Sequence, residues 1–375
     1  MTSPIRVLEV VRPAQGGIRR HVLSLLDGLD PARVTLSLAA PPAFVAEVLH
    51  HPHLHASIPL DIAGSLSPAR DLLAARRLAR VLPQFADLAH AHGLRAAWVC
   101  ALAQRHRAFP FVFTAHNLPS LSLPSRLATA SIGARCARVL AVSPSVADGL
   151  AACGIPRGKI VVVPNGIDLD SFAAASQDRA AARQSFGLSE NAFVVVTAAR
   201  LSREKGIDTL LAAATQRGGM TFLIAGDGPE QAALAKCAPA NVRFLGRLDD
   251  IRPLLAAADV CVIPSRREGQ GLTALEAMAA GVPLIASRVG GLADMLVDSE
   301  TALLVPPSDP DALAAALSRL QSDRRLRAKL AEAALPVVQS RYALGPMLDA
   351  VTAVYEEVIG RNEAEEPNAG PPSPQ

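Results

Sequence analysis

The sequence predicts an α/β protein with two Rossmann-like domains that face each other. Short apolar runs typical of buried strands recur along the chain, and each is followed by a segment with the apolar spacing of a helix. This alternation begins with the strand predicted at 5–10. It starts again, after a turn with the sequence P-N-G, with the strand predicted at 193–198. A chain of 375 residues, 50% of them hydrophobic, is long enough to form two such cores.

Composition excludes several classes of protein. No apolar run is long enough to span a membrane, and the N-terminal sequence predicts a first strand rather than a signal peptide. The five cysteines are scattered and form no C-x-x-C pair, which indicates a reduced protein of the cytoplasm. The histidines between positions 50 and 55 have no thiol or carboxylate among them, so a surface loop is favoured over a metal site.

The charges are unevenly distributed along the chain. The net charge is +3, but residues 1–165 carry 17 Lys and Arg against 8 Asp and Glu. This excess predicts an anionic partner, either a membrane surface or a phosphorylated acceptor. Nucleic acid is disfavoured because aromatic side chains do not alternate with the basic ones. The helix predicted at 67–81 has an arginine-rich face, which is either a solvated face or a patch that contacts a membrane.

Two features of the first half indicate a ligand crevice. Gly16 and Gly17 stand between the first strand and a helix, an arrangement that suits phosphate, although a tight strand-to-helix turn is the simpler interpretation. Strands predicted at 88–92 and 111–116 end at His92 and His116. The carboxyl ends of parallel strands border the ligand crevice of such sheets, but a histidine there is about as often structural as functional.

In the second half, Arg200 and Lys205 follow the strand at 193–198 and precede a helix. Two cations at this junction suit a diphosphate, because arginine offers a planar fork of donors and lysine a point charge. A pair of surface cations is the ordinary alternative.

The most informative stretch is 259–291, where a buried strand at 260–263 leads through a glycine-containing loop to a helix. Thr273 and Glu276 have the spacing of a capping box, and the free N–H groups of the helix start suit an anion. Glu268 and Glu276 are acceptors that suit hydroxyl groups, so the stretch predicts a ligand with both phosphate and hydroxyls, such as a nucleotide sugar. The alternative, for each residue taken alone, is that Glu276 serves only as the capping-box glutamate and that Glu268 is only a solvated loop residue.

This stretch resembles the retaining glycosyltransferases of family 4, which have the GT-B fold. Glu268 and Glu276, with seven residues between them, fit the Glu-x7-Glu motif of that family. The frame P-S-x-x-E-G-x-G-L-x-x-L-E-A-M-A-x-G-x-P-L-I-A is similar as well. Gln270 departs from the pattern, because an aromatic residue often stands there. The similarity covers nearly all of 5–360.

The resemblance implies a division of the chain. Residues 1–165 would form the acceptor-binding domain and residues 166–345 the donor-binding domain, with the active site in the cleft between them. A C-terminal helix at 346–360 would pack back on the N-terminal domain, and an acidic, proline-rich tail at 361–375 would be disordered.

The resemblance also implies roles for individual residues. The donor diphosphate would contact Arg200, Lys205, the Gly16–Gly17 loop and the main-chain N–H groups of Leu272 and Thr273. Glu276 would bind the ribose. Glu268 and His116 would act as catalytic residues beside the donor sugar, and His92 and Gly271 are weaker candidates for contact with the sugar or the acceptor.

The implied activity is the transfer of a sugar from a nucleotide-diphosphate-sugar donor to a lipid, glycan or small-molecule acceptor with retention of configuration. No cofactor is expected, and no metal is expected because no Asp-x-Asp motif is placed to hold one. The implied location is the cytoplasm, with peripheral contact at the inner face of an anionic membrane left open. Two alternatives remain: a GT-B nucleotide-sugar epimerase and a non-catalytic nucleotide-sugar-binding protein.

Overall fold

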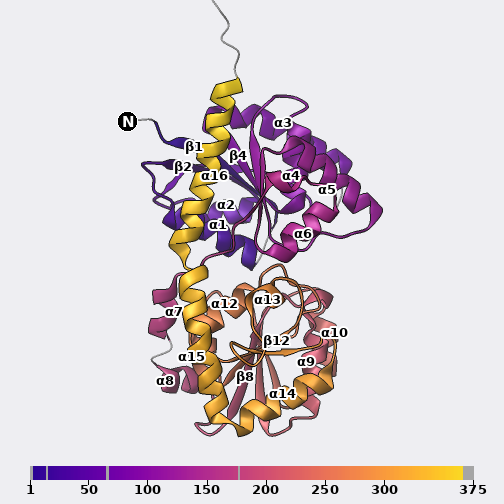
Figure 1. The fold of residues 1–375 in the computed structure, drawn as a ribbon, viewed down its shortest axis with the longest axis vertical. Coiled ribbons are helices and arrows are strands. Elements are labelled where there is room, and N and C mark those ends of the chain that lie inside the picture. The colour runs from indigo at the N-terminus through magenta and orange to yellow at the C-terminus, as the bar shows by residue number, and fades with distance from the viewer. Residues whose placement is uncertain (1–2, 14–15, 65–66, 176–177, 366–375) are drawn as a thin grey trace, which may run out of the picture.

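A computed structural model describes residues 3–13, 16–64, 67–175 and 178–365 of the chain. Figure 1 shows two α/β domains placed one above the other along the long axis of the molecule. The N-terminal domain holds a sheet of seven parallel strands in the order β3-β2-β1-β4-β5-β6-β7. Its strands are β1 Ile5–Val11, β2 Val34–Ala40, β3 Leu54–Pro59, β4 Leu88–His92, β5 Phe111–Ala115, β6 Arg138–Ala141 and β7 Ile160–Val162. Its helices are α1 Gly17–Gly28, α2 Pro42–Val48, α3 Pro68–Phe85, α4 Gly93–Ala103, α5 Leu123–Arg135 and α6 Pro144–Ala152.

The C-terminal domain repeats this architecture with six parallel strands in the order β10-β9-β8-β11-β12-β13. Its strands are β8 Phe193–Ala198, β9 Met220–Ala225, β10 Val242–Gly246, β11 Val260–Ile263, β12 Leu284–Ser287 and β13 Leu303–Val305. Its helices are α7 Leu169–Ala175, α8 Arg179–Ser185, α9 Ile207–Thr215, α10 Gln231–Cys237, α11 Arg252–Ala257, α12 Leu272–Ala279, α13 Gly290–Met295, α14 Pro310–Ser322 and α15 Arg324–Arg341.

The sheets are covered on both faces, which explains their almost continuous apolar strands. Successive side chains of a strand point to opposite faces, so Leu8 and Val10 of β1 lie in one core while Val7 and Val11 lie in another. In each sheet the strand order reverses once, between β1 and β4 and between β8 and β11. Ligands bind beyond the carboxyl ends of strands at such switch points. A ligand site is therefore expected beyond the ends of these two pairs of strands.

The last helix, α16 Leu344–Glu365, returns to the N-terminal domain, and Figure 1 shows it running along that domain. Its residues Met347, Val351 and Tyr355 share a core with Val7 and Val22. The helix continues to Glu365 and so enters the stretch 361–375, which the sequence predicts to be a disordered tail. Residues 366–375 lie outside the described residues.

The five cysteines are free. His51 contacts Asp27, and Nδ1 of His53 lies 3.1 Å from the carbonyl oxygen of Leu26, so these two histidines hold their loop against α1. No helix among the described residues is both long and apolar enough to cross a bilayer.

Candidate active site

A cavity of about 420 Å³ lies between the two domains. Its walls come from the loops at the carboxyl ends of β1, β5, β8, β9 and β11 and from the first turns of α1 and α12. Most of the predicted site residues meet there, although they are scattered over the sequence. Those that line the cavity are Gly16, Gly17, His116, Arg200, Lys205, Glu268, Gly271, Leu272, Thr273 and Glu276.

One wall carries the two predicted cations. Nζ of Lys205 lies 2.8 and 2.7 Å from the two carboxylate oxygens of Glu268, which is 9% exposed and also accepts a hydrogen bond from the hydroxyl of Ser265. Arg200 is exposed, and its guanidinium has no ion-pair partner within the described ranges. This wall therefore offers a guanidinium to an anion, next to a carboxylate that is already oriented.

A glycine brings Lys205 to this position. Gly206 has φ +64°, and a Cβ there would lie 2.0 Å from the carbonyl oxygen of Pro264. Only glycine combines this left-handed conformation with so close an approach. The turn that carries Lys205 can consequently pack against the end of β11, beside Glu268.

Helix α12 begins differently from the prediction. Its N-cap is Gly271, with φ +93°, and the first helical residue is Leu272. Thr273 therefore lies inside the first turn and its hydroxyl donates to the carbonyl of Ala198 at 2.9 Å, so the predicted capping box is wrong. The first-turn N–H groups of Leu272 and Thr273 have no acceptor within the helix, and both residues line the cavity.

Without a capping role, the carboxylate of Glu276 is available to the cavity. It is 3% exposed, and one oxygen pairs with Arg20 of α1 across the cleft. The other oxygen has no hydrogen-bond partner in the part of the chain that the structure describes. Burial lowers the pKa of Arg20 to about 10, which still leaves it charged at neutral pH.

The glycine loop before α1 approaches the other domain closely. Gly16 has φ +67°, and a Cβ on Gly17 would lie 3.2 Å from the Leu272 side chain. Arg12, which the sequence did not single out, also lines the cavity. Burial lowers the pKa of Arg12, and the charges of Arg200 and Arg95 lower it further. A cation directly after the first strand is the sequence signal that could have identified it.

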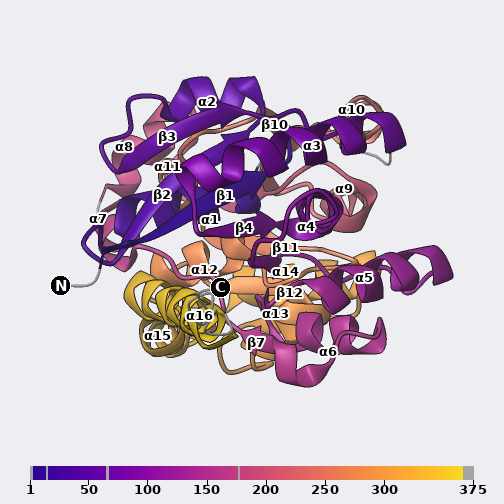
Figure 2. The same cartoon turned by 90° about the horizontal axis from the view of Figure 1, so that it is seen from above.

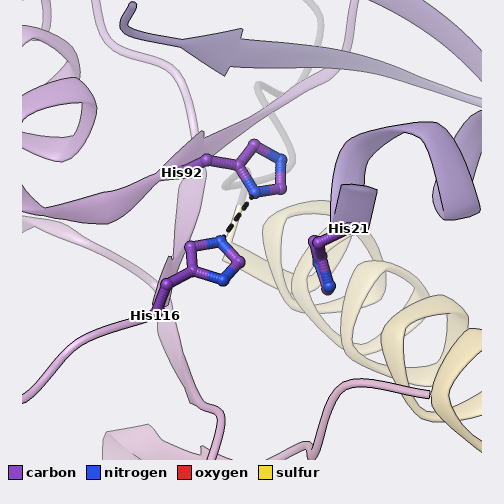
Figure 3. Close-up of side chains that lie close together, drawn as sticks. All are labelled: His21, His92 and His116. Atoms are coloured by element: carbon purple, nitrogen blue, oxygen red, sulfur yellow. Dashed lines mark hydrogen bonds between the residues drawn. The ribbon is translucent and has the colours of Figure 1, made fainter. Parts of the chain in front are cut away.

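His92 does not line the cavity, in contrast to the expectation of a direct contact. It is fully buried behind His116, and its Nδ1 lies 3.2 Å from Nε2 of that half-buried residue (Figure 3). Its Nε2 lies 2.5 Å from a carboxylate oxygen of Glu9. The ring of His21, on α1, packs near both, with centroid distances of 4.9 Å to His116 and 5.4 Å to His92. His92 is kept from the cavity because the rings of His116 and His21 pack against it.

These histidines are held neutral. Burial, reinforced by the neighbouring histidines His90 and His92, lowers the pKa of His21 to about 3. Burial and His90 lower the pKa of His92 to about 4, against the opposing effect of Glu9. Burial, reinforced by the neighbouring histidines and by Arg12, also lowers the pKa of His116 well below its usual value.

Two groups of side chains have nitrogen or oxygen atoms close enough together to share a metal ion. They are His21, His92 and His116, and Glu9, His90 and His92. In both groups the hydrogen bonds between His92 and Glu9 and between His92 and His116 already engage ring nitrogens.

The departure at Gln270 also has a structural role. The side-chain oxygen of Gln270 accepts hydrogen bonds from the main-chain N–H and the amide of Asn165, at 2.8 and 2.6 Å. Asn165 lies where the chain leaves the N-terminal domain, so Gln270 ties the loop of Glu268 to the domain crossover. Sequence reasoning did not assign Gln270 a function because its partner is 105 positions away.

Comparisons with known proteins agree with this architecture. A model described as "Glycosyltransferase Family 4" matches residues 15–171, and one described as "Glycosyl transferases group 1" matches residues 192–323. The chain is 31% identical to a D-inositol 3-phosphate glycosyltransferase of Saccharomonospora viridis over 314 residues, which are 74% of this chain and 71% of that protein. The chain belongs to glycosyltransferase family 4. The resemblance inferred from the Glu268–Glu276 stretch is thereby confirmed.

Other relatives of this family 4 chain match over a smaller part of their length. A D-inositol 3-phosphate glycosyltransferase of Salinispora arenicola is 33% identical over 66% of this chain, which spans 64% of that protein. An alpha-D-kanosaminyltransferase of Streptomyces kanamyceticus is 33% identical over 50% of this chain, which spans 52% of that protein. The chain thus spans less than two thirds of the length of these two relatives.

Solved structures identify the fold of this family 4 chain. HepE of Anabaena, solved in complex with UDP and glucose, superposes with a TM-score of 0.84 at 23% identity, over 93% of this chain and 99% of that one. Sucrose-phosphate synthase of Thermosynechococcus elongatus superposes with a TM-score of 0.81 at 23% identity, over 96% of this chain and 100% of that one. The predicted GT-B fold is therefore confirmed.

Proposed function

We propose that this family 4 chain is a retaining glycosyltransferase that transfers a sugar from a nucleotide-diphosphate-sugar donor to a hydroxyl acceptor without a metal ion. One observation carries the proposal: a single interdomain cavity combines cations and free helix N–H groups with two oriented carboxylates, Glu268 and Glu276. The first set suits a diphosphate and the second suits hydroxyls, and a nucleotide sugar carries both. Relatives named as glycosyltransferases support the same class of reaction.

In this proposal the donor diphosphate lies against Arg200, Lys205 and the start of α12, with the Gly16–Gly17 loop on its other side. Glu276 accepts hydrogen bonds from the ribose and Glu268 from the sugar. The bond between the anomeric carbon and the phosphate oxygen breaks while the acceptor oxygen bonds to the same face. The acceptor proton passes to the departing phosphate. The cations stabilise the charge that develops there, which is the task a metal ion performs in other enzymes.

The proposal is tested by donor binding and turnover in the presence of EDTA. Full-length protein is screened by thermal shift against UDP-, GDP- and ADP-sugars. A donor at 100 times its Kd should add about 2.7 kcal/mol to the free energy of unfolding. Arg200→Ala and Lys205→Ala should each lower turnover by roughly 10²-fold or more. Arg203→Ala, an exposed cation of the same turn that does not line the cavity, is the control. Full turnover in both cavity variants, or strict dependence on a divalent ion, would contradict the assignment.

Product analysis separates the two alternatives from transfer. An epimerase converts a nucleotide sugar without a second substrate. A non-catalytic binding protein shows the thermal shift but forms no product.

We also propose peripheral contact of the N-terminal domain with an anionic membrane, from a location in the cytoplasm. Helix α3 exposes Arg70, Arg76, Arg77 and Arg80. Figure 2 shows α3 and α5 flanking α4, and they expose Leu73 on α3 and Leu123 and Leu127 on α5. Basic side chains beside exposed leucines suit a lipid surface and would bring the cavity to a lipid acceptor. Flotation with anionic liposomes at low salt, lost at high salt, is expected; no flotation at low salt would remove the idea.

A further inference from the structure

A buried carboxylate behind the cavity has no lysine or arginine beside it among the described residues. Glu9, in the middle of β1, is fully buried. Its partners are the hydroxyl of Tyr355, which donates to it at 3.1 Å, and the imidazoles of His92 at 2.5 Å and His90 at 3.3 Å. Burial by itself would raise the pKa of Glu9, but its interaction with His90 and the hydrogen bonds from His90 and His92 outweigh burial and lower that pKa far below its usual range. Glu9 is therefore ionised and can only accept hydrogen bonds.

The ionised state of Glu9 fixes which ring nitrogens of His92 and His116 carry protons. Because Glu9 only accepts, Nε2 of His92 must carry the proton between them. Neutral His92 has one ring proton, so its Nδ1 is an acceptor. His116 must then donate to it through Nε2, at 3.2 Å. In neutral His116 this leaves Nδ1 without a proton.

That free nitrogen belongs to the side chain that reaches the cavity. His116 lines the cavity, and its Nδ1 accepts no hydrogen bond from any residue that the structure describes. Figure 3 shows the His92–His116 contact, with the ring of His21 beside the two bonded rings. The packing of His21 at 4.9 Å limits rotation of the His116 ring.

We infer that Glu9 and His92 are positioning residues that hold His116 in the tautomer whose Nδ1 accepts a hydrogen bond from a substrate hydroxyl. This inference rests on the proposed function, because it assigns one contact within the same cavity. An acceptor nitrogen suits a hydroxyl and not a phosphate oxygen, which itself only accepts. The sugar or the acceptor alcohol should therefore meet His116, while the diphosphate lies at the opposite wall with Arg200 and Lys205.

The tautomer is measured directly by NMR on the full chain labelled with ¹⁵N-histidine, recorded in EDTA. We expect His116 to be protonated at Nε2 and His92 also at Nε2. A proton on Nδ1 of His116 would overturn the inference, whether or not any transfer activity has been found. The same sample titrated with Zn²⁺ examines the competing possibility: stoichiometric loss of this pattern would reassign His21, His92 and His116 as a metal site.

A double-mutant cycle tests whether His92 acts through His116. His92→Phe should lower kcat/KM by about tenfold, the effect of one oriented hydrogen bond, and leave the Kd of the nucleoside diphosphate unchanged. In the His116→Phe background, His92→Phe should have no further effect. Additive losses would show that His92 acts independently and would contradict the inference. His53→Phe, outside the cavity, is the control for replacing a histidine.

The same kinetics locate the hydroxyl. Weaker binding of the intact donor, with unchanged binding of the nucleoside diphosphate, places it on the donor sugar. A rise only in the KM of the acceptor places it on the acceptor.

Discussion

At the scale of single residues, Glu276 links the two walls of the cavity. It pairs with Arg20 across the cleft and has a second oxygen with no partner among the described residues. A hydroxyl donor such as ribose would satisfy that oxygen, whose burial without a partner is costly. That oxygen is not used by a capping box, because Gly271 begins helix α12. Ribose binding by Glu276 stays a prediction.

Glu276→Gln keeps the shape of this side chain and removes its charge. We expect the Kd of the nucleoside diphosphate to rise by about tenfold, because hydrogen bonds to a charged group contribute more than neutral ones. Isothermal titration calorimetry measures this change. Glu356→Gln removes the carboxylate that pairs with Arg33, and because neither residue lines the cavity the Kd should stay unchanged. Equal affinity in wild type and Glu276→Gln would exclude a ribose contact.

The buried histidines predict how stability depends on pH. The pKa values of His21 and His92 are lowered to about 3 and about 4 in the folded state, against about 6.5 when unfolded. Between these values the unfolded chain binds more protons, so their stabilising contribution is complete above pH 6.5 and is lost as the pH falls. Each should cost on the order of 2 kcal/mol between pH 7 and pH 5. Urea unfolding at both pH values measures the loss, and His21→Phe should reduce it. A pH-independent free energy of unfolding would contradict these shifts.

At the scale of elements, the sequence predicted what is local and missed what depends on distant partners. The strand, loop and helix around Glu268 follow from an apolar run, glycines and helical spacing, and they appear as predicted. The capping box failed because Gly271 can adopt φ +93° and start the helix itself. His92 and His116 gave the same signal, a histidine at a strand end. Only the packing of Glu9, His21 and α16 around them decides which one reaches the cavity.

The loop between β11 and α12 contacts the other domain through a glycine. A Cβ on Gly269 would lie 2.1 Å from the carbonyl oxygen of His116, too close for any side chain. Gly269→Ala should therefore push the domains apart, raise the KM of the donor and destabilise the protein by about 1–3 kcal/mol. Gly345→Ala, near the start of α16 with nothing within 4 Å of its Cβ, should be neutral or stabilising. Thermal unfolding and donor kinetics of the two variants provide the test. A Gly269→Ala protein as stable and active as wild type would show that the domains do not approach this closely.

At the scale of the whole molecule, polar contacts across the cleft hold the two domains together near the cavity. Arg267 donates to the carbonyls of Leu118 and Pro119 in the segment after His116, at 3.1 Å each. Gln270 binds the crossover at Asn165. These contacts lie near the cavity, whose lining residues come from both domains. The relative position of the domains therefore decides whether the cavity is complete.

Asp294 of α13 makes the most direct of these contacts. Its two carboxylate oxygens accept hydrogen bonds from the main-chain N–H and the hydroxyl of Ser145, at the first turn of α6, both at 2.8 Å. Asp294→Ala should remove about 1 kcal/mol from the closed arrangement, because the contact is partly exposed to solvent. We expect a larger radius of gyration in solution scattering, restored by a bound nucleotide sugar, and a higher KM with little change in kcat. Asp148→Ala, which breaks the exposed pair with Arg157 inside the N-terminal domain, is the matched control. If both variants scatter like wild type, other contacts close the cleft, and the domain arrangement does not depend on α6 and α13.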